Sequence, residues 1–127
     1  MAGLTLDSGA FIAFEKGQRK FLALLKGAAN RGDTLTVPAV VLAEVWRGGP
    51  RSALISKLLQ WCNVESTDET LARSAGVAVG AVAGASPIDA IVVASAATRG
   101  DRVVTSDPND VHKLLHHFPA VPGLVSV

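Results

Sequence analysis

The sequence lacks several features that would place it quickly in a functional class. Cys62 is the single cysteine in 127 residues, so no internal disulfide can form, and a reducing cytosol is favoured. No apolar run reaches the ~18 residues that indicate a membrane span. The first residues carry no basic region ahead of an apolar stretch. We therefore expect no signal peptide and a soluble, cytoplasmic protein.

Charge of one sign is not in excess either. Twelve Lys and Arg residues against eleven Asp and Glu residues give a net charge of +1, so any basic surface for nucleic acid must be local. Neither a Walker motif nor a dinucleotide-binding fingerprint occurs. Hydrophobic residues make up 49% of the sequence and charged residues 18%. That balance predicts one compact domain over residues 1–127.

Short apolar runs alternate with helical stretches along the chain. Strands are expected at residues 4–6, 35–37, 63–65, 102–105 and 123–127. Helices are expected from residue 8, then over 18–30, 38–47, about 54–59, 67–79, 86–98 and 108–116. This alternation predicts an α/β domain with a central parallel sheet of four to five strands flanked by helices.

Four carboxylates end or interrupt these apolar runs. Asp7 and Asp107 each follow an expected strand, while Glu44 and Asp89 lie within apolar helical stretches. Helical periodicity places the Glu44 and Asp89 side chains on the apolar face of each helix, which is expected to pack toward the core. Buried, unpaired charges are costly, and no Lys or Arg lies among these runs to neutralise them. A divalent cation such as Mg²⁺ or Mn²⁺ is the simplest partner for four converging carboxylates.

Three of these acids also have a purely structural interpretation. Asp7 and Asp107 precede helices that their side chains could cap, and Ser86-Pro87-Ile88-Asp89 resembles a capping box. Taken singly, each fits a cap better than a metal ligand, but Glu44 lies in mid-helix, where no cap is needed. As a set, the acids gather where parallel strands end, and ligands bind outside that edge of a sheet.

Four motifs carry a resemblance to a known family. They are Leu6-Asp7-Ser8-Gly9-Ala10, Pro38-Ala39-Val40-Val41-Leu42-Ala43-Glu44, Ile88-Asp89-Ala90 and Val104-Thr105-Ser106-Asp107. Their order and spacing resemble the PIN domain, especially the VapC-type toxins of toxin–antitoxin pairs. The resemblance implies a PIN-like three-layer sandwich in which helices cover both faces of a central parallel sheet.

The resemblance also implies an activity, Mg²⁺- or Mn²⁺-dependent cleavage of RNA. The family's acidic positions, which are catalytic and hold the metal, correspond to Asp7, Glu44, Asp89 and Asp107. Three further positions give possible support: Ser8, Thr105 and Asp110. The implied partners are an RNA substrate, a cognate VapB-type antitoxin and a second copy of the chain in a homodimer.

The sequence departs from the family pattern at two places. Gly9 stands where a second hydroxyl residue is common. Asn109 stands where a further acid often follows, and Asp110 comes one residue later. Asp110 is therefore expected to act at the periphery or through water at best, and a simple role in the first turn of a helix fits it about as well.

Several residues near Glu44 have two open interpretations. Arg47, Arg51 and Lys57 follow it closely and could contact RNA phosphates, or they could be ordinary solvated surface. Trp46 and Trp61 could stack on bases, although their apolar neighbours favour core or dimer packing.

Two other functional classes remain as alternatives. A receiver-like or phosphatase-like domain would use an Asp as phosphoacceptor, but it would need a second acid near Asp7, where the sequence has Thr5, Ser8 and Gly9. A non-catalytic module that binds RNA or a partner would use the acids only as helix caps. Binding of Mn²⁺ separates this last alternative from a nuclease.

Overall fold

The computed structural model describes residues 3–127 of the chain. The described strands are β1 (Gly3–Leu6), β2 (Thr34–Pro38), β3 (Cys62–Glu65), β4 (Arg102–Thr105) and β5 (Leu124–Ser126). The described helices are α1 (Ser8–Glu15), α2 (Arg19–Arg31), α3 (Ala39–Val45), α4 (Ala53–Leu59), α5 (Glu69–Ala81), α6 (Pro87–Arg99) and α7 (Pro108–Leu115), with a 3₁₀ turn at Gly49–Ser52.

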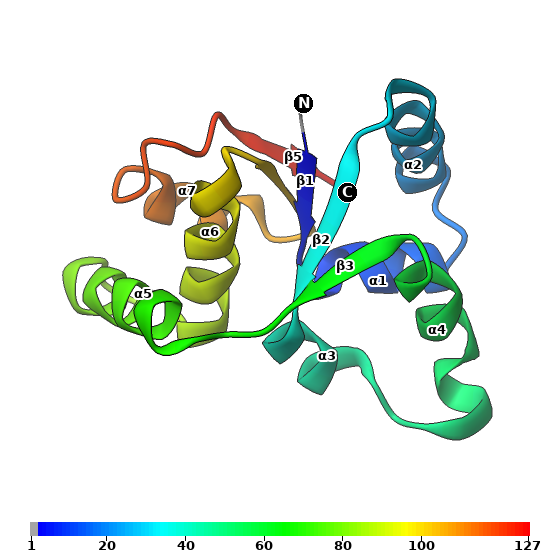
Figure 1. Ribbon diagram of the computed structural model, residues 1–127, viewed down its shortest axis with the longest axis horizontal. Coiled ribbons are helices and arrows are strands. Elements are labelled where there is room, and N and C mark those ends of the chain that lie inside the picture. The colour runs from blue at the N-terminus through cyan, green and yellow to red at the C-terminus, as the bar shows by residue number, and fades with distance from the viewer. Residues whose placement is uncertain (1–2) are drawn as a thin grey trace.

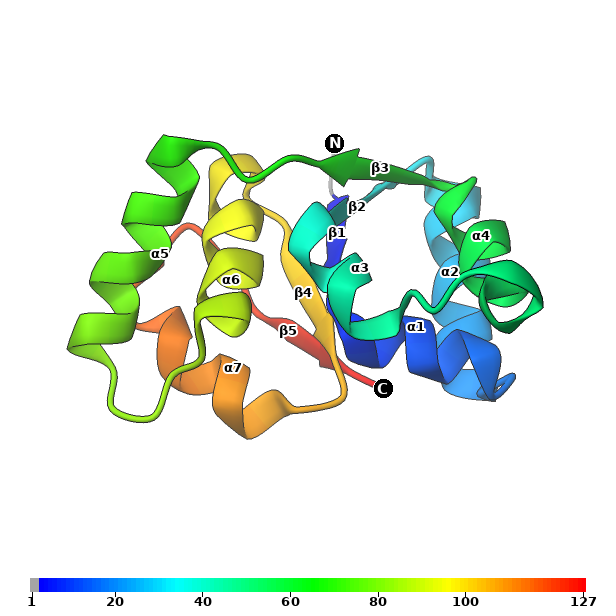
Figure 2. The ribbon, with the colours of Figure 1, turned by 90° about the horizontal axis from the view of Figure 1, so that it is seen from below.

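The five strands form one sheet in the order β3-β2-β1-β4-β5, and every neighbouring pair is parallel. Helices cover both faces of the sheet, as Figures 1 and 2 show. The helices α5, α6 and α7 lie on one side, and α1, α2 and α4 lie on the other. The predicted three-layer α/β architecture with a parallel sheet is confirmed.

Burial of the central strands explains why their sequences are continuous apolar runs. Leu4 and Leu6 of β1 and Val103 and Val104 of β4 are each at most 1% exposed, as expected for strands with both faces covered. Phe11 of α1 packs into the same core. Among the described helices, none is both long enough and apolar enough to cross a membrane.

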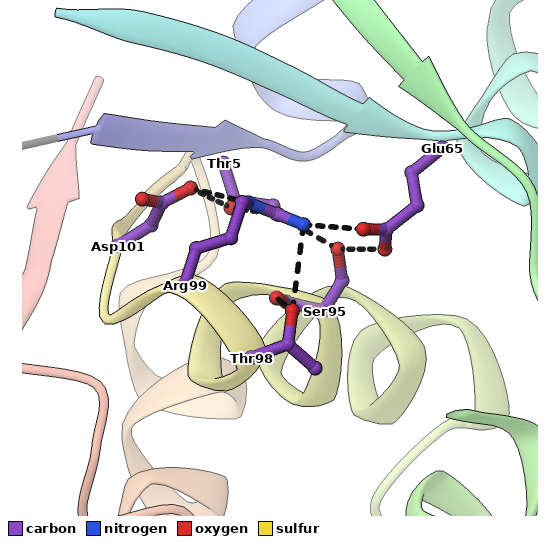
Figure 3. A network of polar contacts seen from close by, with 6 residues as sticks. All are labelled: Thr5, Glu65, Ser95, Thr98, Arg99 and Asp101. Atoms are coloured by element: carbon purple, nitrogen blue, oxygen red, sulfur yellow. Dashed lines mark hydrogen bonds and ion pairs between the residues drawn. The ribbon is translucent and has the colours of Figure 1, made fainter. Parts of the chain in front are cut away.

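A polar network fixes the C-terminal end of α6 to the sheet (Figure 3). The Arg99 guanidinium donates to the Asp101 carboxylate, the Thr5 hydroxyl and the Ser95 hydroxyl at 2.9 Å each, and it also pairs with Glu65. Thr5 in turn donates to Asp101 at 2.9 Å, and Ser95 donates to Glu65 at 2.6 Å. Because each polar group has a partner, the cost of burying these charges is offset.

Removing Arg99 should leave the buried Asp101 carboxylate without its cation. We expect Arg99→Met to lower the free energy of unfolding by about 2–3 kcal/mol, measured by urea denaturation. The matched control is Arg73→Met, which breaks an exposed i,i+4 pair with Glu69 and should cost less than about 0.5 kcal/mol. Equal losses in the two variants would show that the network contributes no more than a surface ion pair.

Candidate active site

The strand order changes direction between β1 and β4. From β1, the chain adds β2 and β3 on one side, then returns to add β4 and β5 on the other. A parallel sheet opens a crevice for ligands at such a point, outside the C-terminal ends of the strands. Asp7 directly follows β1, and its N–H donates to the Val104 carbonyl of β4 at 3.1 Å. Asp107 lies two residues after the end of β4.

Asp7 is a buried carboxylate, with 6% of its surface exposed. Its Oδ1 accepts the backbone N–H groups of Gly9 at 2.8 Å and Ala10 at 3.4 Å, so the predicted cap of α1 is confirmed. Burial raises the pKa of Asp7 to about 6, although hydrogen bonds from Thr105, Gly9 and Ala10 oppose this and the Asp89 charge adds to it. A carboxylate held so tightly in low dielectric would gain much from a cation.

Thr105 links the two acids that follow β1 and β4. Its side chain is fully buried, and its hydroxyl accepts the Asp107 N–H at 2.9 Å. The same side chain lies beside Asp7, where it favours the ionised carboxylate and lowers the Asp7 pKa. One hydroxyl thus lies next to both the Asp7 carboxylate and the Asp107 backbone.

Asp89 lies in the first turn of α6, half-buried at the same edge of the sheet. The Ser86 hydroxyl accepts the Asp89 N–H at 3.1 Å, which confirms the capping bond from Ser86. Burial raises the pKa of Asp89, and the charges of Asp110 and Asp107 raise it further, while Ser86 and Lys113 lower it. Asp89 therefore lies near enough to Asp7, Asp107 and Asp110 for its charge to interact with theirs.

The capping interpretation is wrong for Asp107. It occupies the position before α7, but its side chain accepts no capping hydrogen bond in the described chain, and it is exposed. Its carboxylate oxygens are therefore not committed to the helix. This is the arrangement expected of a side chain that receives its partner from outside the fold.

The prediction that Glu44 points toward the core is wrong. α3 ends at Val45, two residues earlier than expected, and only Val41 in it is fully buried. The Arg47 guanidinium donates to the carbonyls of Trp46 at 2.8 Å and Glu44 at 3.0 Å, which satisfies the end of the short helix. α3 lies beyond the end of β2 rather than across the sheet (Figure 1), and the Glu44 side chain is exposed.

Glu44 nevertheless belongs to the same edge of the molecule as the other acids. α3 packs against α1 and α6, the two helices that begin near Asp7 and Asp89. Glu44 lines an open hollow of about 460 Å³ together with Ile12, Glu15, Val45, Arg47 and Arg51. Two of the three basic residues named near Glu44 in the sequence, Arg47 and Arg51, thus border this hollow, whereas Lys57 does not line it. Arg47 is largely engaged with backbone carbonyls.

Sequence analysis missed one residue of this site, Lys113. Its ammonium lies 3.5 Å from Asp110 Oδ1, and its charge lowers the pKa of Asp89. The apolar runs contain no cation, but α7 brings one to the acids because it packs against α6. The i,i+3 spacing of Asp110 and Lys113 was the available signal.

Gly9 is required by a close approach between α1 and the segment after β4. A Cβ atom at Gly9 would lie 2.2 Å from Ser106 Oγ and 2.7 Å from the Ser106 backbone nitrogen. The departure from the family pattern at Gly9 therefore has a steric cause, because Ser106 fills the space that a side chain would need.

The donor set fits a hard divalent cation in its chemistry. All four candidate ligands are carboxylates, which suit Mg²⁺ and Mn²⁺. Within residues 3–127, no three acidic, His or Cys side chains converge closely enough to form a metal cluster as they stand. Mutual repulsion favours such a spread among like charges, and Glu44 and Asp107 are exposed enough to move inward by side-chain rotation.

Comparison with known proteins agrees with the geometry. The sequence model of the PIN domain matches residues 4–114. The chain belongs to the PIN domain family. The family assignment made from four short motifs is confirmed, and this PIN domain has the strand order β3-β2-β1-β4-β5 rather than the 2-1-3-4-5 order of receiver-like folds. No curated protein sequence gives a significant match.

Three solved structures share the fold of this PIN domain at low sequence identity. The VapBC2 complex of Rickettsia felis bound to promoter DNA aligns with a TM-score of 0.77 at 14% identity, over 100% of this chain and 99% of that chain. DNA-bound VapBC of Salmonella typhimurium aligns with a TM-score of 0.69 at 18% identity, over 100% of this chain and 98% of that chain. FitAB bound to an IR36 DNA fragment aligns with a TM-score of 0.68 at 15% identity, over 97% of this chain and 94% of that chain.

The raised pKa of Asp7 makes a prediction about stability. Between the ordinary Asp pKa near 4 and the folded value of about 6, the folded chain retains a proton that the unfolded chain has lost. Rising pH should therefore lower stability through this window, by about 2–3 kcal/mol in total. Asp7→Asn should remove that loss, so its stability relative to the unmutated protein should rise between pH 4 and pH 7.5.

The measurement is urea denaturation in EDTA at both pH values. Asp68→Asn is the matched control, since Asp68 also caps a helix, by accepting the Leu71 N–H at 2.8 Å, but is exposed. If the difference in unfolding free energy between Asp7→Asn and the unmutated protein stayed constant with pH, as we expect for the control, burial would not raise the pKa of Asp7.

Proposed function

We propose that this PIN domain is a metal-dependent endoribonuclease and the toxin of a toxin–antitoxin pair. The observation that carries the proposal is the position of Asp7. It is a buried acid of raised pKa at the switch point of a parallel sheet, interacting with Asp89 and linked through Thr105 to Asp107. Membership of the PIN family makes nuclease chemistry the natural use of such a site.

Asp7, Glu44, Asp89 and Asp107 would hold one or two Mg²⁺ ions, directly or through water, with Mn²⁺ as a substitute. A bound divalent cation would lower the pKa of water and shield phosphate charge during in-line attack. The chain's own part is to place the acids: Thr105 orients Asp7 and Asp107, and the start of α6 presents Asp89. One carboxylate takes the proton of the attacking water, and cleavage leaves 5′-phosphate and 3′-hydroxyl ends.

Cleavage of RNA in Mg²⁺ and in EDTA tests the activity. We expect EDTA to abolish cleavage and Asp7→Asn to lower its rate by about 100-fold or more, because this change removes the charge while preserving the cap. Asp68→Asn should cleave as the unmutated chain does. Sequencing of RNA ends after brief induction in cells, beside Asp7→Asn, would identify the target.

Two results would count against this function. Undiminished cleavage in EDTA, or full activity of Asp7→Asn, would reject the mechanism. Calorimetry with Mn²⁺ addresses the non-catalytic alternative, in which the acids are only caps and bind little metal. The capping bonds of Asp7 favour that alternative, whereas the uncommitted Asp107 side chain favours the nuclease.

A protein partner is the second part of the proposal. Large apolar side chains remain exposed on the described surface: Ile12, Leu22, Trp46, Leu54, Trp61, Val64 and Val77. Most belong to α1, α2, α3, α4 and β3 or lie just after one of these elements. Such surface is typical of protein interfaces, and it supports a homodimer and a VapB-type antitoxin as partners. The structures with the same fold are of VapBC and FitAB bound to DNA.

We expect the antitoxin to inhibit by placing an Arg among the carboxylates, where it would take the place of the cation. Replacing Asp7, Asp89 and Asp107 by Asn and Glu44 by Gln together should weaken antitoxin binding by about tenfold or more. Calorimetry with the cognate antitoxin measures this. Unchanged affinity of the quadruple variant would show that the antitoxin binds elsewhere.

A further inference from the structure

Lys113 is a cation inside the acidic edge of the fold. Its ammonium lies 3.5 Å from Asp110 Oδ1, and 37% of its side chain is exposed. Its charge also acts on Asp89, from the other side of the α6–α7 contact. Within residues 3–127, no other Lys or Arg forms an ion pair with Asp7, Glu44, Asp89, Asp107 or Asp110.

The backbone around Lys113 leaves room for its ammonium. Gly84, in the segment between α5 and α6, has φ +76°, and a Cβ atom there would lie 3.4 Å from Lys113 Nζ. A Cβ atom there would make an ordinary van der Waals contact with the ammonium. The positive φ is what favours glycine at this position, and the short distance places the Lys113 ammonium beside the loop between α5 and α6.

The pairing of Lys113 with Asp110 is loose. A separation of 3.5 Å between two partly exposed groups is a weak ion pair that water and salt readily screen. Lysine carries a compact charge and three donors on a flexible stem, so its ammonium can leave Asp110 for a nearby anion. This contrasts with Arg99, which is held by several short hydrogen bonds at the other end of α6.

We propose that Lys113 is a phosphate-binding residue of this site, whose ammonium contacts a non-bridging oxygen of the RNA backbone at or beside the cleaved phosphate. The inference rests on the proposed function. An acidic site repels a polyanion, and a phosphate approaching the acids needs a positive contact that does not depend on the metal. Lys113 supplies it from α7, and Asp110 holds the ammonium near the site until the phosphate arrives.

The test measures binding of a mixed-sequence single-stranded RNA with Ca²⁺ in place of Mg²⁺. We expect Lys113→Met to weaken RNA binding about tenfold and to reduce the dependence of log K on log salt by about 0.7. Lys113→Arg should retain most of the affinity. Lys20→Met, which removes the same charge from exposed α2, should bind RNA nearly as the unmutated protein does.

A double variant separates direct contact from simple neutralisation of Asp110. Asp110→Asn with Lys113→Met restores the local charge balance but has no ammonium. If Lys113 binds phosphate, the double variant stays as weak as Lys113→Met. Recovery of full RNA affinity in the double variant would overturn the proposal, and so would equal affinities for Lys113→Met and Lys20→Met.

Calorimetry with Mn²⁺ and no RNA gives an independent readout. We expect Lys113→Met to bind Mn²⁺ at least as tightly as the unmutated protein, because a like charge has been removed. Weaker Mn²⁺ binding would assign Lys113 to support of the acids and overturn the phosphate contact. An unmutated protein that binds no RNA would reject the proposed function as well, whereas binding unaffected by Lys113→Met would reject only this inference.

Discussion

The parallel pairing of β1 with β4 is the constraint on which the candidate site depends. It joins the ends of two strands that lie far apart in the sequence, and it brings the buried Asp7 and the exposed Asp107 to the same edge of the sheet. Burial there makes the ionised carboxylate costly, as the raised Asp7 pKa of about 6 records. A fold selected only for stability would place an apolar residue or an amide at this position, so the acid is best understood through what it can bind.

The two ends of α6 show how differently the chain treats charge. At the C-terminal end, Arg99 is matched by Asp101 and Glu65, and the hydroxyls between them are satisfied (Figure 3). At the N-terminal end, Asp89 faces further acids and its pKa is raised. One helix thus connects a neutralised cluster to one with excess negative charge. The hydrogen bonds of Arg99 anchor the C-terminal end of α6 to the sheet, and the N-terminal end of the same helix carries Asp89.

Much of the fold was predictable because its signals are local. Buried strands such as Arg102–Thr105 are short apolar runs, and Pro87 and Pro108 mark helix starts. Asp7 and Asp107 could be placed at one edge because parallel strands end together. Glu44 was misplaced because helical periodicity assumes a long helix on the sheet, whereas α3 is short and lies beyond β2. The i,i+3 spacing of Asp110 and Lys113 indicates their ion pair, but the approach of Lys113 to Asp89 depends on how α6 packs against α7, which no local pattern encodes.

The balance of charge at this edge explains why one lysine would not take the place of the proposed metal. Lys113 is a single cation beside Asp89 and Asp110, and its ion pair within the described residues is the loose one with Asp110. Asp7 is buried, and the donors that it receives in the described chain are neutral: Thr105 and the N–H groups at the start of α1. Neutral donors lower the cost of its charge without cancelling it. In the proposed function, a divalent ion near Asp7 and the ammonium near Asp110 would therefore have separate tasks: the ion would offset the buried charge, and the ammonium would contact the phosphate.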